Sequence, residues 1–193
     1  DEAGVVTVNF TVKDKAGAAV TYVKSISADI VKLVPPGDNE KTNRWVPYIY
    51  RKQTVSGSAT GNWPNPDGTY AWQATSESAG TGATNGTLTN NGDGSYTYVF
   101  KTNISAIIVD GTTIEYDRSL THRVSIMMGG SSGATADANF DFVPDGSAIT
   151  ETRNIVQTET CKACHGWQFA AHGGNRLSVE TCATCHVPGN IDP

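Results

Sequence analysis

The chain is short of three things: cysteines outside its C-terminal end, charged residues, and long apolar runs. Its 193 residues include only four cysteines, and none precedes Cys161, so a scattered disulfide framework is excluded. Charged residues make up 17% and the net charge is −5, which argues against nucleic acid or an anionic membrane surface as the main partner. No run approaches the roughly 18 apolar residues of a membrane-spanning helix, so no membrane span is predicted.

Common enzyme fingerprints are also missing. The sequence contains no Gly-x-Ser-x-Gly motif, no phosphate-binding loop and no dinucleotide fingerprint. The chain opens at Asp1 with neither Met nor an apolar signal segment, and we expect it to be a mature or trimmed form. That opening does not imply a cytoplasmic location.

Glycine, proline, threonine and serine are abundant, and this composition favours strands over helices. Val6, Val8 and Phe10 alternate with polar residues, the period of a half-buried strand. Turn signals such as Asn90-Asn91-Gly92-Asp93-Gly94 separate the apolar segments. The chain is therefore predicted to be mainly β, an antiparallel sandwich or barrel. The expected strands are residues 5–13, 25–34, 44–52, 69–75, 95–102, 112–116, 120–128 and 140–143.

Two later segments set the expected domain organisation. Residues 129–138, rich in Gly, Ser and Ala, are expected to form a long hairpin loop or a flexible edge. Pro144-Asp145-Gly146 marks a change of pattern. We therefore predict a β domain over residues 1–146 and a separate loop- and helix-containing segment over residues 147–193.

Residues 147–193 contain one motif twice, as Cys-Lys-Ala-Cys-His at 161–165 and Cys-Ala-Thr-Cys-His at 182–186, and this repeat predicts a dihaem segment. Cys-x-x-Cys-His is the attachment signature of c-type haem. The two thiols add to the porphyrin vinyl groups and the histidine donates a nitrogen to the iron. Two haem c groups are expected. Their attachment residues would be Cys161, Cys164, Cys182 and Cys185, and their proximal ligands His165 and His186.

The cysteine pairs have two alternative interpretations. Paired Cys-x-x-Cys motifs about twenty residues apart also occur in zinc ribbons. A zinc ribbon, however, needs no histidine after each pair. A thioredoxin-like dithiol would require a βαβ context, which is missing. Haem is therefore the preferred cofactor.

His172 and His122 are the remaining histidines, and His172 is the expected distal ligand of the second haem. If residues 166–171 are helical, His165 and His172 lie on one helix face, so His172 cannot reach the far side of its own haem. Gly173-Gly174 would then reverse the chain toward the second haem. His122 is expected to be a boundary histidine in a strand, with a distal-ligand role as the alternative.

Smaller expectations concern the surroundings of the haems. Met127 and Met128 are expected in the core rather than on iron. Lys162, Arg153 and Arg176 are candidates either for pairing with haem propionates or for solvated positions.

Several segments together resemble the OmcA/MtrC family of multihaem cytochromes, which lie on the outer surface of metal-reducing bacteria. The segments are 152–156, both haem motifs with their preceding threonines, His172-Gly173-Gly174, and Gly-Asp-Gly-Ser-Tyr-Thr-Tyr-x-Phe at 92–100. The resemblance implies a split Greek-key β-barrel ahead of a haem domain. It also implies haems that form a wire to minerals, flavins or partner cytochromes. Members typically carry ten haems and a lipid-anchoring cysteine, and this chain has two motifs and no such cysteine.

The leading functional hypothesis is extracellular electron transfer at the cell outer surface, not catalysis in a shaped pocket. Expected partners are other multihaem cytochromes or neighbouring subunits, with metal oxides or flavins as acceptors and a terminal metal-reductase activity compatible with that role. One alternative is a catalytic or sensing protein with a five-coordinate haem, since His172 is the one well-supported distal ligand for two irons. Another alternative is a subunit of a cytochrome filament, completed by its neighbour.

Overall fold

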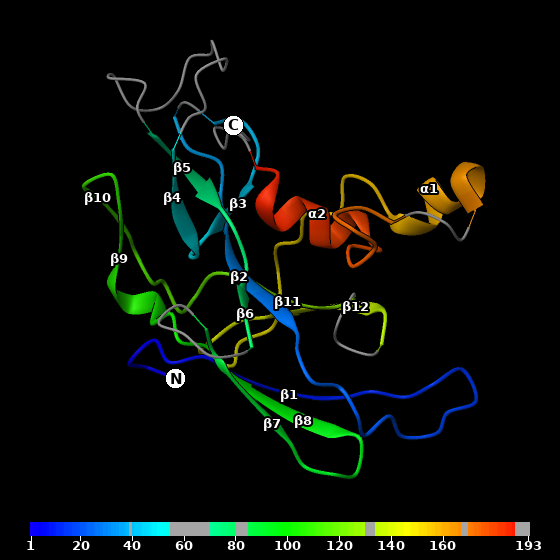
Figure 1. The fold of residues 1–193 in the computed structure, drawn as a ribbon. Coiled ribbons are helices and arrows are strands. Elements are labelled where there is room, and N and C mark those ends of the chain that lie inside the picture. The colour runs from blue at the N-terminus through cyan, green and yellow to red at the C-terminus, as the bar shows by residue number, and fades with distance from the viewer. Residues whose placement is uncertain (39, 55–69, 80–84, 130–133, 167–169, 188–193) are drawn as a thin grey trace.

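A computed structural model places a β-rich part first and a short helical part after it (Figure 1). Both Cys-x-x-Cys-His motifs lie in the helical part. No helix within the described residues is long and apolar enough to cross a lipid bilayer. The residues that the structure describes are 1–38, 40–54, 70–79, 85–129, 134–166 and 170–187.

All pairings between the named strands are antiparallel, so the predicted mainly β, antiparallel fold is confirmed. The strands are β1 (Thr7–Thr11), β2 (Ser27–Val34), β3 (Arg44–Pro47), β4 (Tyr50–Thr54), β5 (Tyr70–Ala74), β6 (Glu77–Ser78), β7 (Thr87–Asn90), β8 (Ser95–Val99), β9 (Ile107–Val109), β10 (Thr112–Ile114), β11 (His122–Met128) and β12 (Ala136–Phe142). The larger sheet has the order β12-β11-β2-β3, with β6 also paired to β2, and a second sheet has the order β1-β8-β7. β4-β5 and β9-β10 form two-stranded sheets.

Strand β2 lies inside the larger sheet, and both of its faces are covered. Ala28 and Ile30 belong to the main core between the sheets, whereas Val31 and Leu33 form a second cluster with Trp45 on the opposite face. Burying an aliphatic side chain such as Ile30 stabilises the fold by about 1.5–3 kcal/mol. A strand covered on both faces needs apolar residues on both, which explains why its sequence alternates only weakly.

Two strand predictions are wrong in their bounds. The segment 44–52 is not one strand, because the chain leaves β2 at Pro47 and pairs with β5 from Tyr50 onward. The segment expected to be a loop up to residue 138 already contains the start of β12 at Ala136. Alanines occupy two of the inward positions at that start, so the apolar alternation was hidden by small residues.

The helical part consists of α1 (Thr158–His165) and α2 (Val179–Cys185), preceded earlier in the chain by a short 3-10 turn, η1 (Ile104–Ala106). Ser178 caps α2, since its hydroxyl accepts a hydrogen bond from the Thr181 N–H. Helix α2 packs on the outer face of the larger sheet, and α1 lies further from the β-rich part (Figure 1).

Candidate haem sites

Strand β12 positions the start of α2 through its outward-facing polar side chains. The Asp137 carboxylate accepts hydrogen bonds from the Leu177 and Ser178 N–H groups at 3.0 and 2.9 Å and from the Ser178 hydroxyl at 2.8 Å. The Asn139 amide donates to the same hydroxyl and its oxygen accepts from Thr181. The helix that carries the second motif is therefore fixed to the sheet by its first turn.

Deeper under α2, Asp29 of β2 lies beside the second motif. Its Oδ2 atom is 2.8 Å from the Thr184 hydroxyl and 3.7 Å from the Cys185 sulfur. Its Oδ1 atom has no hydrogen-bond partner in the described part of the chain. Burial, opposed mainly by the hydrogen bond from Thr184, raises the pKa of Asp29 to about 6.

The two motif helices cap each other. The Glu180 carboxylate of α2 accepts hydrogen bonds from the Thr158 N–H at 3.1 Å and from the Thr158 hydroxyl. In return the Thr158 hydroxyl oxygen accepts from the Val179 N–H at 2.9 Å. Burial alone would raise the pKa of Glu180, but the hydrogen bonds from Thr158 outweigh it and lower that pKa. The N-termini of α1 and α2 are thereby held at one point.

His172 lies directly beside the proximal histidine of the second motif. The ring centroids of His172 and His186 are 6.0 Å apart, with an angle of 36° between the ring planes. A tight turn presents His172: Ala171 and Arg176 pair across it, and Gly173 and Gly174 adopt left-handed backbone angles. His172 itself has a φ of 50°, a conformation that is uncommon outside glycine and clusters at functional sites.

A cavity of about 250 Å³ joins these histidines to the second cysteine pair. His172, His186, Cys182 and Cys185 line it on one side, and residues 73–76 line it on the other. Two guanidinium groups also line it, one from Arg51 of β4 and one from Arg176 of the turn. The Arg176 Nη1 atom is buried and makes no hydrogen bond to the described residues.

The first motif adjoins a different cavity, of about 400 Å³. Cys161 and Trp45 line it, together with Arg153 and the exposed apolar side chains of Ile155 and Val156. Arg153 donates to the backbone oxygen of Asn43, and Lys162 forms an ion pair of 3.1 Å with Glu159.

His122 is buried and lies far from both motifs in the sequence. Its side chain is 0% exposed, and both ring nitrogens are engaged: Nε2 lies 2.9 Å from the Tyr48 hydroxyl and Nδ1 lies 2.8 Å from the Leu120 oxygen. Burial lowers the pKa of His122, so the ring is neutral. The structure does not bring His122 to a haem motif, and the distal-ligand hypothesis for it finds no support. Met127 and Met128 are buried in the fold, as expected.

The predicted helix from His165 to His172 is wrong. Helix α1 ends at His165, and Gly166 follows with a φ of 63° as its C-terminal cap. Residues 167–169 lie outside the described residues, and Ala171 already belongs to the turn. Gly166 is the one helix breaker of residues 166–171, and the helix ends there instead of continuing through it, so the reason given for the placement of His172 does not hold.

The residues present fit a haem better than a zinc ion at the second motif. Two imidazoles on opposite sides of one metal ion have ring centroids about 6 Å apart, because each metal–nitrogen bond is about 2 Å long. That matches the spacing of His172 and His186. Burial and the neighbouring Asp29 carboxyl raise the pKa of the Cys185 thiol to about 12. Among the described residues, no three His, Cys, Asp or Glu side chains are placed to hold a metal ion.

A β domain carrying two haem-attachment motifs on a short helical segment defines the class of multihaem c-type cytochromes. Two sequence profiles match the chain: the OmcA-like N-terminal domain over residues 1–150, and the outer membrane cytochrome MtrC/MtrF-like domains II/IV over residues 153–192. The chain belongs to the OmcA/MtrC family.

Individual relatives agree with this placement. The chain is 30% identical to the multiheme cytochrome MtrC of Shewanella baltica (strain OS185), over 97% of this chain and 26% of that protein. It superposes on the crystal structure of the outer membrane decaheme cytochrome OmcA with a TM-score of 0.76 and 30% identity, covering 99% of this chain and 29% of that one. For MtrC from Shewanella baltica OS185 the TM-score is 0.72 and the identity 26%, covering 98% of this chain and 28% of that one. The chain thus spans less than a third of the length of these relatives.

Several residues of the sites were missed from the sequence. Asp29, Asp137 and Glu180 all contact the second motif or its helix, and none was singled out. A lone carboxylate in the apolar strand 27–34 was the available signal for Asp29. The alternation of Asp137, Asn139 and Asp141 was the signal for a polar strand face.

Proposed function

We propose that this chain is an electron-transfer module that holds two haem c groups on α1 and α2. The observation that carries the proposal is the pairing of His172 with His186 beside Cys182 and Cys185 in one cavity. A haem iron with two histidine ligands has no open position, which suits one-electron transfer rather than catalysis.

The chain's own residues would bind and orient the groups. Cys182 and Cys185 would tether the second haem, His186 would hold its iron from the proximal side and His172 from the distal side. Arg51 and Arg176 line the same cavity, and their guanidinium groups are suited to the haem carboxylates. When bound, the haems supply the redox chemistry.

The first motif is proposed to bind its haem through Cys161, Cys164 and His165. The apolar side chains of Ile155 and Val156 lie where they would cover part of a porphyrin face. Mutual capping of α1 and α2 by Thr158 and Glu180 would keep the two groups at a constant separation. A constant separation is what efficient transfer between neighbouring haems requires.

The location and acceptors proposed for the chain follow its relatives. The homologue and the structures that match the chain are multihaem cytochromes, and OmcA is an outer membrane cytochrome. We infer an extracellular position at the cell surface, other multihaem cytochromes as partners, and metal oxides or flavins as acceptors.

Replacing His172 tests the proposal directly. In His172→Ala we expect the haem on Cys182 and Cys185 to become high-spin when oxidised and to bind carbon monoxide when reduced, adding one bound CO per chain to the wild-type value. His172→Met should restore a six-coordinate iron, because methionine also ligates haem. Absorbance and magnetic circular dichroism report the change. Unaltered spectra in His172→Ala would refute the assignment.

A second candidate function rests on the first motif. All four histidines of the chain lie within the described residues, and after His172 and His122 are placed, none remains near His165 as a distal ligand. An open iron there would bind small ligands such as CO. CO titration of the reduced wild-type protein distinguishes the two: one CO per chain supports an open first site, and none supports a ligand supplied from outside these residues.

A further inference from the structure

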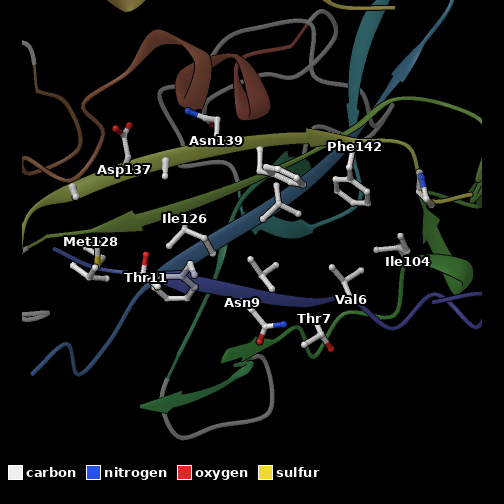
Figure 2. A pocket seen from close by; sticks show the side chains of 18 of the residues that line it. Val6, Thr7, Asn9, Thr11, Ile104, Ile126, Met128, Asp137, Asn139 and Phe142 are labelled. Atoms are coloured by element: carbon white, nitrogen blue, oxygen red, sulfur yellow. The ribbon is translucent and has the colours of Figure 1, made fainter. Parts of the chain in front are cut away.

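Inward-facing side chains of β1, β11 and β12 surround an apolar cavity of about 690 Å³ (Figure 2). Phe10, Ile126, Met128, Phe140 and Phe142 are among its walls. The volume lies within the range of about 300–1,000 Å³ that ligand pockets occupy, and well-packed interiors have few voids larger than a water molecule. This space is therefore too large to be a packing defect.

The cavity and the haem motifs lie on opposite faces of β12. Asp137 and Asn139 point away from the cavity (Figure 2) and bond to the start of α2. Phe140 and Phe142 alternate with them and face the cavity. The cavity is thus a site of its own and does not depend on the haem assignments.

Aromatic rings form two of its walls, and each ring is held by a neighbour. Phe10 stacks on Tyr96, with ring centroids 5.4 Å apart and an interplanar angle of 17°. Phe140 stacks on Phe142 at 6.1 Å and 19°. Phe140 is nonetheless 68% exposed, which is unusual for a large aromatic side chain beside an apolar space. Stacking therefore holds the aromatic walls in position, while Phe140 stays exposed to solvent.

The chemistry of the walls limits what fits. On β1 and β12 the polar residues direct their side chains outward: Asn9 bonds to Thr97 at 2.9 Å, and Asp137 and Asn139 bond toward α2. Asp1 and Lys13 also line the cavity, but they lie before and after β1 in the sequence. Between the aromatic walls a charged ligand would lose its hydration without compensation. A peptide strand added between the edges of β1 and β12 would not fill the space beneath β12, which extends to Ile126 and Met128 of β11.

We propose that this cavity binds a single uncharged, mainly apolar molecule with a fused aromatic ring system, seated between Phe10 and the Phe140–Phe142 pair. Flat rings stack on aromatic walls with a gain beyond their buried area. Covering Phe140 would also remove the exposed aromatic surface of β12.

Two probes that differ in one group test the charge requirement. The haem-loaded full chain is dialysed to equilibrium against N-phenyl-1-naphthylamine, which is neutral, or against 1-anilinonaphthalene-8-sulfonate, which carries an added sulfonate. Saturable binding of a single neutral molecule per chain is expected, with the sulfonate at least about tenfold weaker. Absence of saturable binding, or equal binding of both probes, overturns the proposal.

Three variants test the location. Phe140→Ala should weaken binding of the neutral probe about tenfold, because one aromatic wall is lost. Ala138→Trp should abolish binding by filling the space, and both positions are exposed enough for the fold to tolerate the change. Tyr22→Ala, at an exposed aromatic residue outside the cavity, should leave binding unchanged. Equal effects of Phe140→Ala and Tyr22→Ala would show that the probe binds elsewhere.

Discussion

Asp29 is a carboxyl buried beneath the second motif, and its burial favours the neutral form. The Thr184 hydroxyl has one proton but two acceptors within reach, Asp29 Oδ2 at 2.8 Å and the Thr181 carbonyl oxygen at 2.6 Å. The single hydroxyl proton therefore stabilises the Asp29 carboxylate only in part. Burial is the larger effect and raises the pKa of Asp29.

Asp29→Asn should therefore stabilise the protein at alkaline pH and not at acid pH. The pKa of Asp29 is 3.8 in the unfolded chain and about 6 in the folded chain, so wild-type stability falls as pH rises between these values and stays lower above them. Asparagine stays neutral, so the variant should gain on the order of 3 kcal/mol at about pH 8 and little at about pH 4. Denaturant unfolding at the two pH values measures this. An equal difference at both would mean that Asp29 does not titrate as described.

His122→Ala should cost stability without altering either haem. Both ring nitrogens are hydrogen-bonded and the ring is buried, so removal leaves a cavity and takes one hydrogen-bond partner from the Tyr48 hydroxyl. The expected loss is about 2–4 kcal/mol. Tyr48→Phe, which removes only the hydroxyl, should cost about 1 kcal/mol. Denaturant unfolding measures both losses. An absorbance spectrum that shows a change in the spin state of a haem iron would contradict the structural role.

At the level of elements, the joint cap of α1 and α2 gives a matched pair of variants. Glu180→Ala removes the carboxylate that accepts from Thr158 and should cost about 1–2 kcal/mol. Glu159→Ala, at the equivalent position of the first motif, breaks only an exposed ion pair with Lys162 and should cost less than about 0.5 kcal/mol. Unfolding of both variants checks the difference. Equal losses would mean that the cap contributes nothing.

Element type was more predictable than element bounds. The alternation of Val6, Val8 and Phe10 predicts β1, and the haem motifs indicate short helical turns, as observed in α1 and α2. The start of β12 was missed because Ala136 and Ala138 carry too little apolar surface to show a period of two. The short strands β7 and β9 were missed because three or four residues give no period to detect.

At the scale of the whole molecule, residues 1–146 are expected to fold without haem. The main core lies between the two larger sheets and draws on residues before 147. Helix α2 covers Trp45, Val31 and Leu33 on the outer face, so the shortened chain should be less stable than the full protein but still cooperative. A β-type circular dichroism spectrum with a cooperative melt is the expected result. A gradual melt without a transition would contradict an independent β domain.

Local motifs predict the haem ligands, whereas tertiary packing determines which residues surround the motifs. The two Cys-x-x-Cys-His segments name their cysteines and proximal histidines by spacing alone. Arg51 and Asp29 come to the second motif from β4 and β2, more than a hundred residues earlier in the chain, so no local pattern identifies them. His172 lies in a turn, whereas the sequence predicted that a helix continues from His165 to it. Helix α1 ends at His165, so this local prediction is wrong.

Mutual capping also has a consequence for how the protein matures. Until α2 is formed, the first backbone N–H of α1 has no Glu180 to accept it, and until α1 is formed, the Val179 N–H has no Thr158 hydroxyl. The conformational entropy lost on ordering the segment is therefore offset fully only when both helices have formed. Fixing one haem to its cysteines prepares the other helix for attachment, so loading should be cooperative, and chains with a single haem should be scarce at every stage of assembly.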